Sequence, residues 1–185
     1  FNKQEIFTKN NFLNKIKSKS FILIHLDEKW FSDTYKGRRG ERNFEPINPN
    51  KEKFLDFLKE IIKKTNLDLV VSSGKDKSCL IKELEENTPQ TFLGTKFIQP
   101  TNNKIFFLNN LNFNDLILTI KKAKLIITCH GSPSHIASSF DVNIIDIFDE
   151  KNKNFYKFWT QHLRNYKYLY RESFTNLSKK IIELI

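Results

Sequence analysis

The feature that most constrains the fold is a regular alternation of short apolar runs with amphipathic segments. A continuous apolar run such as 21–26, interrupted only by His25, is typical of a strand that is covered on both faces of its sheet. The clearest helical segment is 51–64, where Phe54, Leu58 and Ile61 fall on one stripe. This alternation predicts an α/β fold, namely a Rossmann-like open parallel sheet with helices on both faces.

The other expected elements follow the same alternation. Strands are expected at 67–73, 104–108, 124–129, 142–148 and 166–170, with a short one near 94–98. Helices are expected at 4–17, 77–87 and 134–140, from Asn114 and Asn176 onward, and at 51–64 with Asn50 as the N-cap. A long loop at 27–50 and a polar, aromatic-rich connection after 148 complete the chain. Its 185 residues fit a single domain, 1–185, with a core at 19–150 and a basic, aromatic C-terminal segment and helix at 151–185.

The net charge of +10 says little about nucleic acid. Lysine supplies 26 of the 31 basic residues, and lysine, asparagine, isoleucine and phenylalanine, all with A/T-dominated codons, make up 85 residues. Only five residues are arginine, the side chain expected where phosphates or base edges are read specifically. The charge is +4 over 1–60, zero over 61–150 and +6 over 151–185. We therefore expect a solvated lysine surface, and a face that binds a polyanion such as nucleic acid stays open as the alternative.

The cysteines and the apolar runs limit the other function classes. Cys79 and Cys129 lie 50 positions apart and are expected to be reduced, separately buried thiols. No run is long enough to cross a bilayer and no signal-peptide pattern opens the chain, so we expect a cytoplasmic protein. There is no Asp-x-Asp pair and no recognised ligand spacing around Cys129, His130 and His135, so neither a metal nor a cofactor is expected.

The first candidate site is the turn 128–137, which follows a buried strand and opens a helix. Gly131 would let a ligand approach the backbone, and Ser132 or Ser134 would cap the helix. The free N–H groups of the first turn would form an anion site, with His130 and His135 beside it. A plain strand-turn-helix with a serine cap explains the same residues and stays open as an alternative.

The second candidate site is the long loop after 26. It carries Lys29, Trp30, Lys36, Arg38 and Arg39, and two glycines within it would allow close contact with a diphosphate. A solvated basic loop is the alternative, and Trp30 is expected to pack on the core.

The stretch 114–148 resembles the C-terminal half of GT-B glycosyltransferases, especially glycosyltransferase family 9, the heptosyltransferases. In that family a helix and strand lead into an Asp-Ser/Thr-Gly-x-x-His-x-Ala turn, and here the turn is Cys129-His130-Gly131 through His135-Ile136-Ala137. The apolar strand before Lys29-Trp30 and the run LDLVVSSGKDK are similar to the start of that half. This chain has Cys129-His130 in place of Asp-Ser/Thr, and one extra residue before His135.

The resemblance implies a domain that binds a nucleotide diphosphate-sugar in a crevice formed by the loops after residues 26, 73, 108 and 129. It assigns donor binding to Lys29, Lys36, Arg38, Arg39, His130, Gly131, Ser132, Ser134 and His135. The implied function is a part in hexosyl or heptosyl transfer to a cell-envelope glycan or lipopolysaccharide, with a glycan or lipid-linked acceptor as partner. The family's general base lies in an N-terminal half for which 185 residues leave no room, so no catalytic residue is assigned and enzyme activity stays open.

A non-catalytic Rossmann-like module is the alternative function. It would bind a partner chain, an anionic membrane or single-stranded nucleic acid through a basic, aromatic contact region. Its residues would be Phe155, Tyr156, Phe158, Trp159, Arg164, Tyr166, Tyr168, Tyr170 and Arg171. We expect these rings to pack the last helix onto the sheet instead, while peripheral attachment at the inner membrane face stays open.

Overall fold

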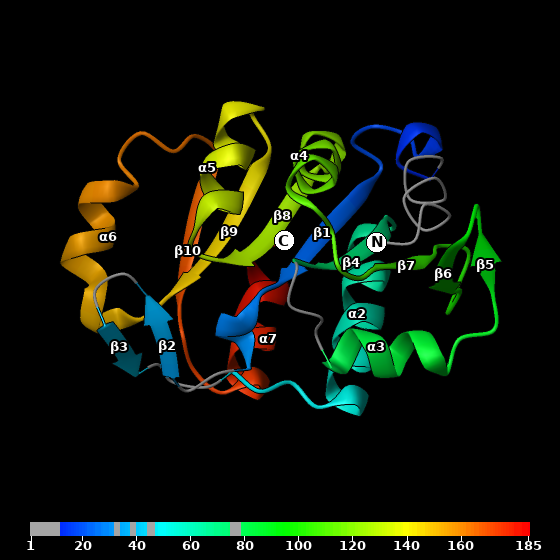
Figure 1. The fold of residues 1–185 in the computed structure, drawn as a ribbon, viewed down its shortest axis with the longest axis horizontal. Coiled ribbons are helices and arrows are strands. Elements are labelled where there is room, and N and C mark those ends of the chain that lie inside the picture. The colour runs from blue at the N-terminus through cyan, green and yellow to red at the C-terminus, as the bar shows by residue number, and fades with distance from the viewer. Residues whose placement is uncertain (1–11, 32–33, 38–39, 44–46, 75–78) are drawn as a thin grey trace.

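The computed structural model describes residues 12–31, 34–37, 40–43, 47–74 and 79–185. Its centre is an eight-stranded sheet in the order β10-β9-β8-β1-β4-β7-β6-β5 (Figure 1). All neighbours from β10 to β7 are parallel, which confirms the expected Rossmann-like α/β fold. The strands are β1 (Phe21–Leu26), β4 (Asp68–Ser73), β5 (Thr91–Phe92), β6 (Thr95–Ile98), β7 (Ile105–Leu108), β8 (Leu125–Cys129), β9 (Asn143–Phe148) and β10 (Tyr166–Tyr170).

The strand order places a topological switch point in the middle of the sheet. The chain builds outward from β1 through β4 to β7, then places β8 on the other side of β1 and continues to β9 and β10. In open parallel sheets of this kind, ligands bind outside the carboxyl ends of the two strands at which the direction reverses. Those ends are here the segments that follow β1 and β8.

One edge of the sheet differs from the all-parallel expectation. β5 and β6 form a hairpin, and β6 pairs antiparallel with β7. The two residues between them, Leu93 and Gly94, have φ values of 52° and 76°, the positive pair that a tight two-residue hairpin turn needs. Only one short strand is expected from the sequence in this region, because β5 is too brief to show a pattern.

Helices cover both faces of the sheet. Side chains of α2 (Lys51–Thr65), α3 (Cys79–Glu86) and α7 (Phe174–Leu184) pack in one core cluster with Ile22 and Ile24 of β1. Side chains of α4 (Phe113–Lys122), α5 (Ser132–Ser139) and the helical residues 12–15 pack in the other with Phe21 and Leu23. Successive residues of β1 thus face opposite layers, which explains why this run is apolar at every position except His25. Asn50 caps α2 as expected, accepting from the amide of Lys53 at 2.9 Å.

Both stretches expected to be irregular contain regular structure. The segment after β1 holds a 3-10 helix, η1 (Glu28–Trp30), and a separate hairpin of β2 (Thr34–Gly37) and β3 (Gly40–Asn43). The connection after β9 holds a second 3-10 helix, η2 (Glu150–Asn152), and a helix, α6 (Lys153–Trp159). Neither the hairpin nor α6 belongs to the main alternation of sheet strands and covering helices, and α6 turns most of its aromatic rings outward. The hydrophobic periodicity that predicts core elements therefore predicts neither the hairpin nor α6.

Smaller differences concern helix starts and one cysteine. α4 is capped by Asn112 and begins before the expected Asn114, and α7 begins at Phe174 rather than at Asn176. Cys129 is buried as expected, but Cys79 is exposed because it opens α3 on the side away from the core residues of that helix. Within the described residues, no helix combines the length and apolar character that crossing a bilayer requires.

Candidate functional site

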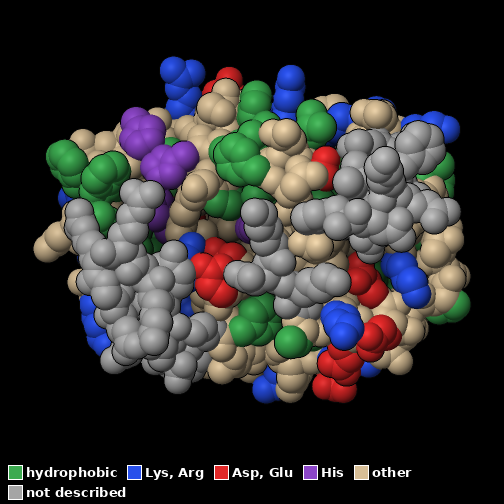
Figure 2. Space-filling view, in the orientation of Figure 1, with side chains coloured by type: hydrophobic (Ala, Val, Ile, Leu, Met, Phe, Trp, Pro, Cys, Tyr) green, Lys and Arg blue, Asp and Glu red, His purple; other side chains and the backbone are tan. Residues whose placement is uncertain are grey.

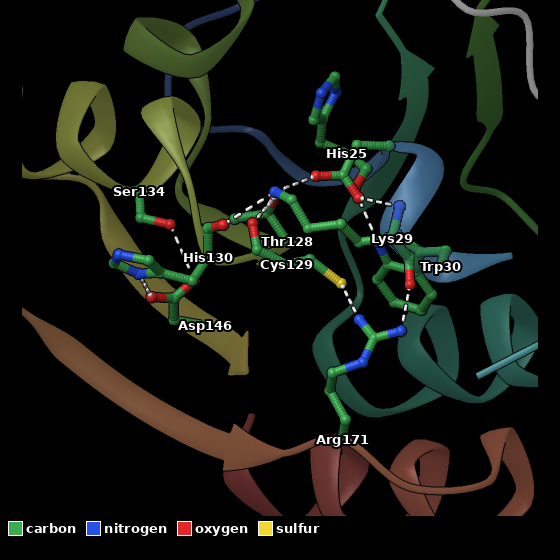
Figure 3. Close-up of polar contacts among 10 residues, drawn as sticks. His25, Lys29, Trp30, Thr128, Cys129, His130, Ser134, Asp146 and Arg171 are labelled. Atoms are coloured by element: carbon green, nitrogen blue, oxygen red, sulfur yellow. Dashed lines mark hydrogen bonds and ion pairs between the residues drawn. The ribbon is translucent and has the colours of Figure 1, made fainter. Parts of the chain in front are cut away.

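Two chain segments meet at the switch point, one leaving β1 and one leaving β8. The ammonium of Lys29, in η1, joins them, because its Nζ lies 2.8 Å from Asp27 Oδ2 and 2.9 Å from the carbonyl oxygen of His130 (Figure 3). Burial is the largest single influence and lowers the pKa of Lys29, but the charge and hydrogen bond of Asp27, together with Cys129 and Glu28, outweigh it and hold that pKa well above its usual value. Lys29 therefore stays charged at neutral pH, with Asp27 as its counter-ion.

Gly131 brings the backbone of the β8 turn directly beside this ammonium. A Cβ built on Gly131 would lie 3.1 Å from Lys29 Nζ. The φ of 171° is extended backbone that any residue adopts, so the constraint at Gly131 comes from the space beside the Lys29 ammonium and not from backbone conformation. Gly131 is also the N-cap of α5, and its own N–H and that of Ser132 have no acceptor within the helix. The turn thus offers amide donors and a close approach next to a fixed positive charge.

The expected serine cap is wrong, because both serines lie inside α5. The helix begins at Ser132, with Pro133 in its first turn, where a missing N–H costs nothing. Ser132 is exposed at the N-terminus. Ser134 is fully buried and donates its hydroxyl to Asp146 Oδ1 at 2.8 Å, so it is engaged inside the protein.

A buried carboxylate on β9 organises the far side of the turn. Asp146 is 0% exposed and interacts with three side chains: Ser134 Oγ, His130 Nδ1 at 2.5 Å and the Tyr166 hydroxyl at 3.1 Å. A carboxylate only accepts, so the Nδ1 of His130 carries the shared proton and its Nε2 is turned away from Asp146. Burial, followed by the charge of Asp146, raises the pKa of Tyr166, which keeps its proton for this contact. Asp146 therefore fixes the orientation of the His130 ring.

Beneath the switch point, a buried arginine ties the C-terminal part of the chain to both loops. Arg171 donates to Cys129 Sγ at 3.3 Å and to the carbonyl oxygen of Lys29. Burial raises the pKa of the Cys129 thiol, which therefore stays protonated and is not a nucleophile at neutral pH. Trp30 is fully buried, as expected, and its Nε1 donates to the carbonyl oxygen of His25 at 3.1 Å.

His25, at the end of β1, is a neutral imidazole in the core. It is 3% exposed, and its Nδ1 lies 3.0 Å from Ser72 Oγ on β4. Burial, with a smaller contribution from the Lys29 charge, lowers the pKa of His25 from 6.5 to about 4. The ring thus adds no charge to the site at physiological pH.

His135 lies on the outer side of α5 and stacks on a histidine that follows α6. Its ring is 5.2 Å from that of His162, with Nδ1 and Nε2 3.2 Å apart, and 5.4 Å from that of His130. Burial lowers the pKa of His135, and the two neighbouring histidines lower it further. His135 is thus a neutral hydrogen-bonding group at the rim of the turn. No group of three or more His, Cys, Asp or Glu side chains in the described part of the chain has the geometry of a metal site.

The remaining predicted site residues belong to the hairpin segment. Arg38 and Arg39 lie outside the described residues. Lys36 is on β2, and its side chain is likewise outside the description. Their assignment to the donor phosphates stays a prediction.

Asp146, Arg171 and His162 belong to the site region but are absent from the sequence-based assignment of donor-binding residues. Asp146 is an acidic residue in an otherwise apolar strand, and such a residue must find partners when the strand is buried. Arg171 follows the last strand and is grouped by sequence with the exposed basic residues, whereas the structure buries it. His162 carries no signal in the sequence, because its contact with His135 spans 27 positions.

A pocket at the opposite edge of the sheet is the alternative candidate for a binding site. It has a volume of about 500 Å³ and is lined by residues at the amino ends of the strands, among them Ile22, Leu125 and Ile144. None of the residues that line this pocket is a glycine, and none lies at the N-terminus of a helix. Because the amides and the fixed cation gather at the carboxyl ends, we assign the candidate site to that edge.

Comparison with known proteins supports the fold class. No family model matches the chain, and no curated protein sequence matches it. The structure of ADP-heptose lipopolysaccharide heptosyltransferase II from E. coli is similar, with a TM-score of 0.54 and 10% sequence identity over 99% of this chain and 50% of that one. The wall teichoic acid polymerase TagF aligns at a TM-score of 0.43 and 13% identity over 97% of this chain and 38% of that one.

The resemblance to the GT-B glycosyltransferases, and to the heptosyltransferases among them, is thereby confirmed at the level of the fold. The chain spans half the length of the heptosyltransferase that it matches.

Proposed function

We propose that this chain is the donor-binding half of a GT-B glycosyltransferase and binds a nucleotide diphosphate-sugar at the switch point. The observation that carries the proposal is the close approach of Gly131 to Lys29 Nζ, with the N-terminus of α5 at the same place. Backbone amides, a helix dipole and a fixed ammonium are the groups that stabilise a diphosphate, both when bound and as a leaving group.

The donor would lie across the carboxyl ends of β1 and β8. Its diphosphate would accept hydrogen bonds from the backbone N–H groups of Gly131 and Ser132. The ring of His130, held by Asp146, would present Nε2 toward the ligand. His135 would contact the sugar or the outer phosphate as a neutral donor. Lys36, Arg38 and Arg39 would add positive charge, which the site needs because Asp27 already balances Lys29. The acceptor would be a cell-envelope glycan or lipopolysaccharide, and it would be bound by a part of the enzyme that is not included in this chain.

Calorimetry with ADP, UDP, GDP and dTDP tests this proposal. We expect the native chain to bind at least one of them, and Gly131→Ala to weaken that binding at least tenfold, because its Cβ would fill the approach beside Lys29. The variant should keep its melting temperature within a few degrees, since the backbone at Gly131 suits any residue.

Ser139→Ala, at the exposed far end of the same helix, is the matched control and should bind like the native chain. Absence of binding by the native chain to all four nucleotides would contradict the proposal. Unchanged binding by Gly131→Ala would place the nucleotide somewhere else on the chain.

A further inference from the structure

The helix α6 exposes a cluster of large aromatic side chains at one end of the molecule. Phe155 is 41%, Phe158 70% and Trp159 49% exposed, and the expectation that these rings pack against the sheet is wrong for all three. Together with Tyr168 of β10, this region holds four of the seven large hydrophobic side chains that are exposed in the described residues. In Figure 2, hydrophobic side chains gather at the left edge of the face, where α6 lies in Figure 1.

The orientation of α6 is fixed by one inward-facing ring. Tyr156 is 8% exposed, and its ring centroid lies 4.6 Å from those of His130 and Phe148. At about 100° per residue, the other three aromatic residues occupy an arc of roughly 100°, whose centre lies about 110° around the helix from this anchor. Their rings contact one another, with Trp159 5.8 Å from Phe155 and 6.4 Å from Phe158. The three rings form one protruding cluster, held outward by the packing of Tyr156.

Positive charge surrounds this cluster. The segment 151–171 contains six basic residues and no acidic one, and the nearest acidic residue that is exposed before it is Glu150. Of the six, only Arg171 is buried. Lys157 lies about 100° around α6 from Phe158, and Lys153 lies on the side of the helix opposite the aromatic arc, where its Nζ is 5.8 Å from the ring centroid of Tyr170. The five exposed basic residues are Lys151, Lys153, Lys157, Arg164 and Lys167.

We propose that α6 docks this chain on an anionic lipid bilayer, with Phe155, Phe158 and Trp159 inserted at the interface. Tryptophan and phenylalanine are favoured at the boundary between headgroups and acyl chains, and the exposed basic residues of the same segment gain attraction from anionic headgroups. A single-stranded nucleic acid needs ring faces spaced along a groove, whereas these rings form one cluster on a convex helix. Lysine, a point charge, also suits a diffuse lipid surface better than a specific phosphate contact.

Tryptophan fluorescence offers a clean readout of this docking. The chain has two tryptophans, and Trp30 is 0% exposed while Trp159 is 49% exposed. A blue shift of the emission on adding vesicles therefore reports burial of Trp159. We expect this shift, and co-sedimentation, with vesicles of phosphatidylcholine and phosphatidylglycerol in a 7:3 ratio, and at least tenfold weaker partitioning onto pure phosphatidylcholine. Raising the salt should weaken the binding.

Two pairs of variants separate the aromatic from the electrostatic contribution. Phe155→Ser with Phe158→Ser, and Lys153→Glu with Lys157→Glu, should each reduce partitioning onto the anionic vesicles at least tenfold. All four side chains are exposed, so the melting temperature should not change by more than a few degrees. The matched controls are Phe113→Ser on α4, where Phe113 is 60% exposed, and Lys59→Glu with Lys63→Glu on α2, and they should partition within about twofold of the native chain.

Three results would overturn the proposal. One is no emission shift and no co-sedimentation of the native chain with anionic vesicles. Another is equal loss of partitioning in the control variants, since that would reflect net charge or general hydrophobicity. The third is tighter binding to a single-stranded oligonucleotide than to the vesicles with the same dependence on α6, which would assign the cluster to nucleic acid.

Discussion

Replacing Asp146 by alanine should lower the free energy of unfolding by about 4 kcal/mol and the melting temperature by roughly 10 °C. The carboxylate is 0% exposed and serves three side chains from three different elements: Ser134 of α5, His130 of the β8 turn and Tyr166 of β10. Its loss leaves their buried donors without an acceptor and opens a cavity beside them. Denaturant unfolding followed by circular dichroism measures the change.

Two variants show whether this loss comes from the hydrogen bonds of Asp146. Asp146→Asn keeps the shape and one acceptor oxygen, so the loss should be less than half as large. Glu150→Ala removes an exposed carboxylate that follows the same strand and should change stability by less than about 1 kcal/mol. If Asp146→Ala were as stable as Glu150→Ala, Asp146 would not be the organiser of the turn.

Acidification should destabilise the fold through His25 by about 3 kcal/mol between pH 6.5 and pH 4. The pKa of this histidine falls to about 4 in the folded state from an ordinary value of 6.5. Below pH 6.5 the unfolded chain takes up a proton that the folded chain does not, so stability decreases as the pH falls. The contribution is complete near pH 4, where the folded state also becomes protonated.

The comparison that isolates this effect is His25→Gln. Carboxylates titrate in the same pH range, so the difference between native chain and variant, measured by urea unfolding at several pH values, carries the His25 contribution. The glutamine variant keeps a hydrogen-bonding group near Ser72 and should lose less stability on acidification, by about 3 kcal/mol over that range. Parallel pH profiles of the two proteins would show that His25 does not remain neutral in the folded state.

Most of the fold can be predicted from the sequence because both layers of the core leave a periodic signal. The strand 21–26 is buried on every residue and apolar at all but His25, and α2 has a single apolar stripe. Strand order carries no such signal, since the sequence alone does not say that β8 pairs with β1. The hairpin of β2 and β3 and the helix α6 were missed because neither belongs to the sheet and its covering helices.

The candidate site can be predicted only where its residues are close in sequence. The turn at Gly131 and the lysine at 29 are both visible as segments that follow apolar strands. Their meeting, through Lys29 and the carbonyl oxygen of His130, spans 101 positions and depends on the switch point. Asp146 was missed as a partner of His130 for the same reason, since the strand pairing of β8 with β9 brings them together.

Nuclear magnetic resonance of the uniformly ¹⁵N-labelled chain, titrated with each of the four nucleoside diphosphates, tests the central claim most directly. We predict saturable shifts that are largest for the amides of Lys29, His130, Gly131 and Ser132, at the carboxyl ends of β1 and β8. The pocket of about 500 Å³ at the opposite edge provides the internal comparison, through the amides of Leu125 and Ile144. Saturable shifts concentrated there, or no saturable shift with any of the four nucleotides, would contradict a nucleotide-sugar site at the switch point.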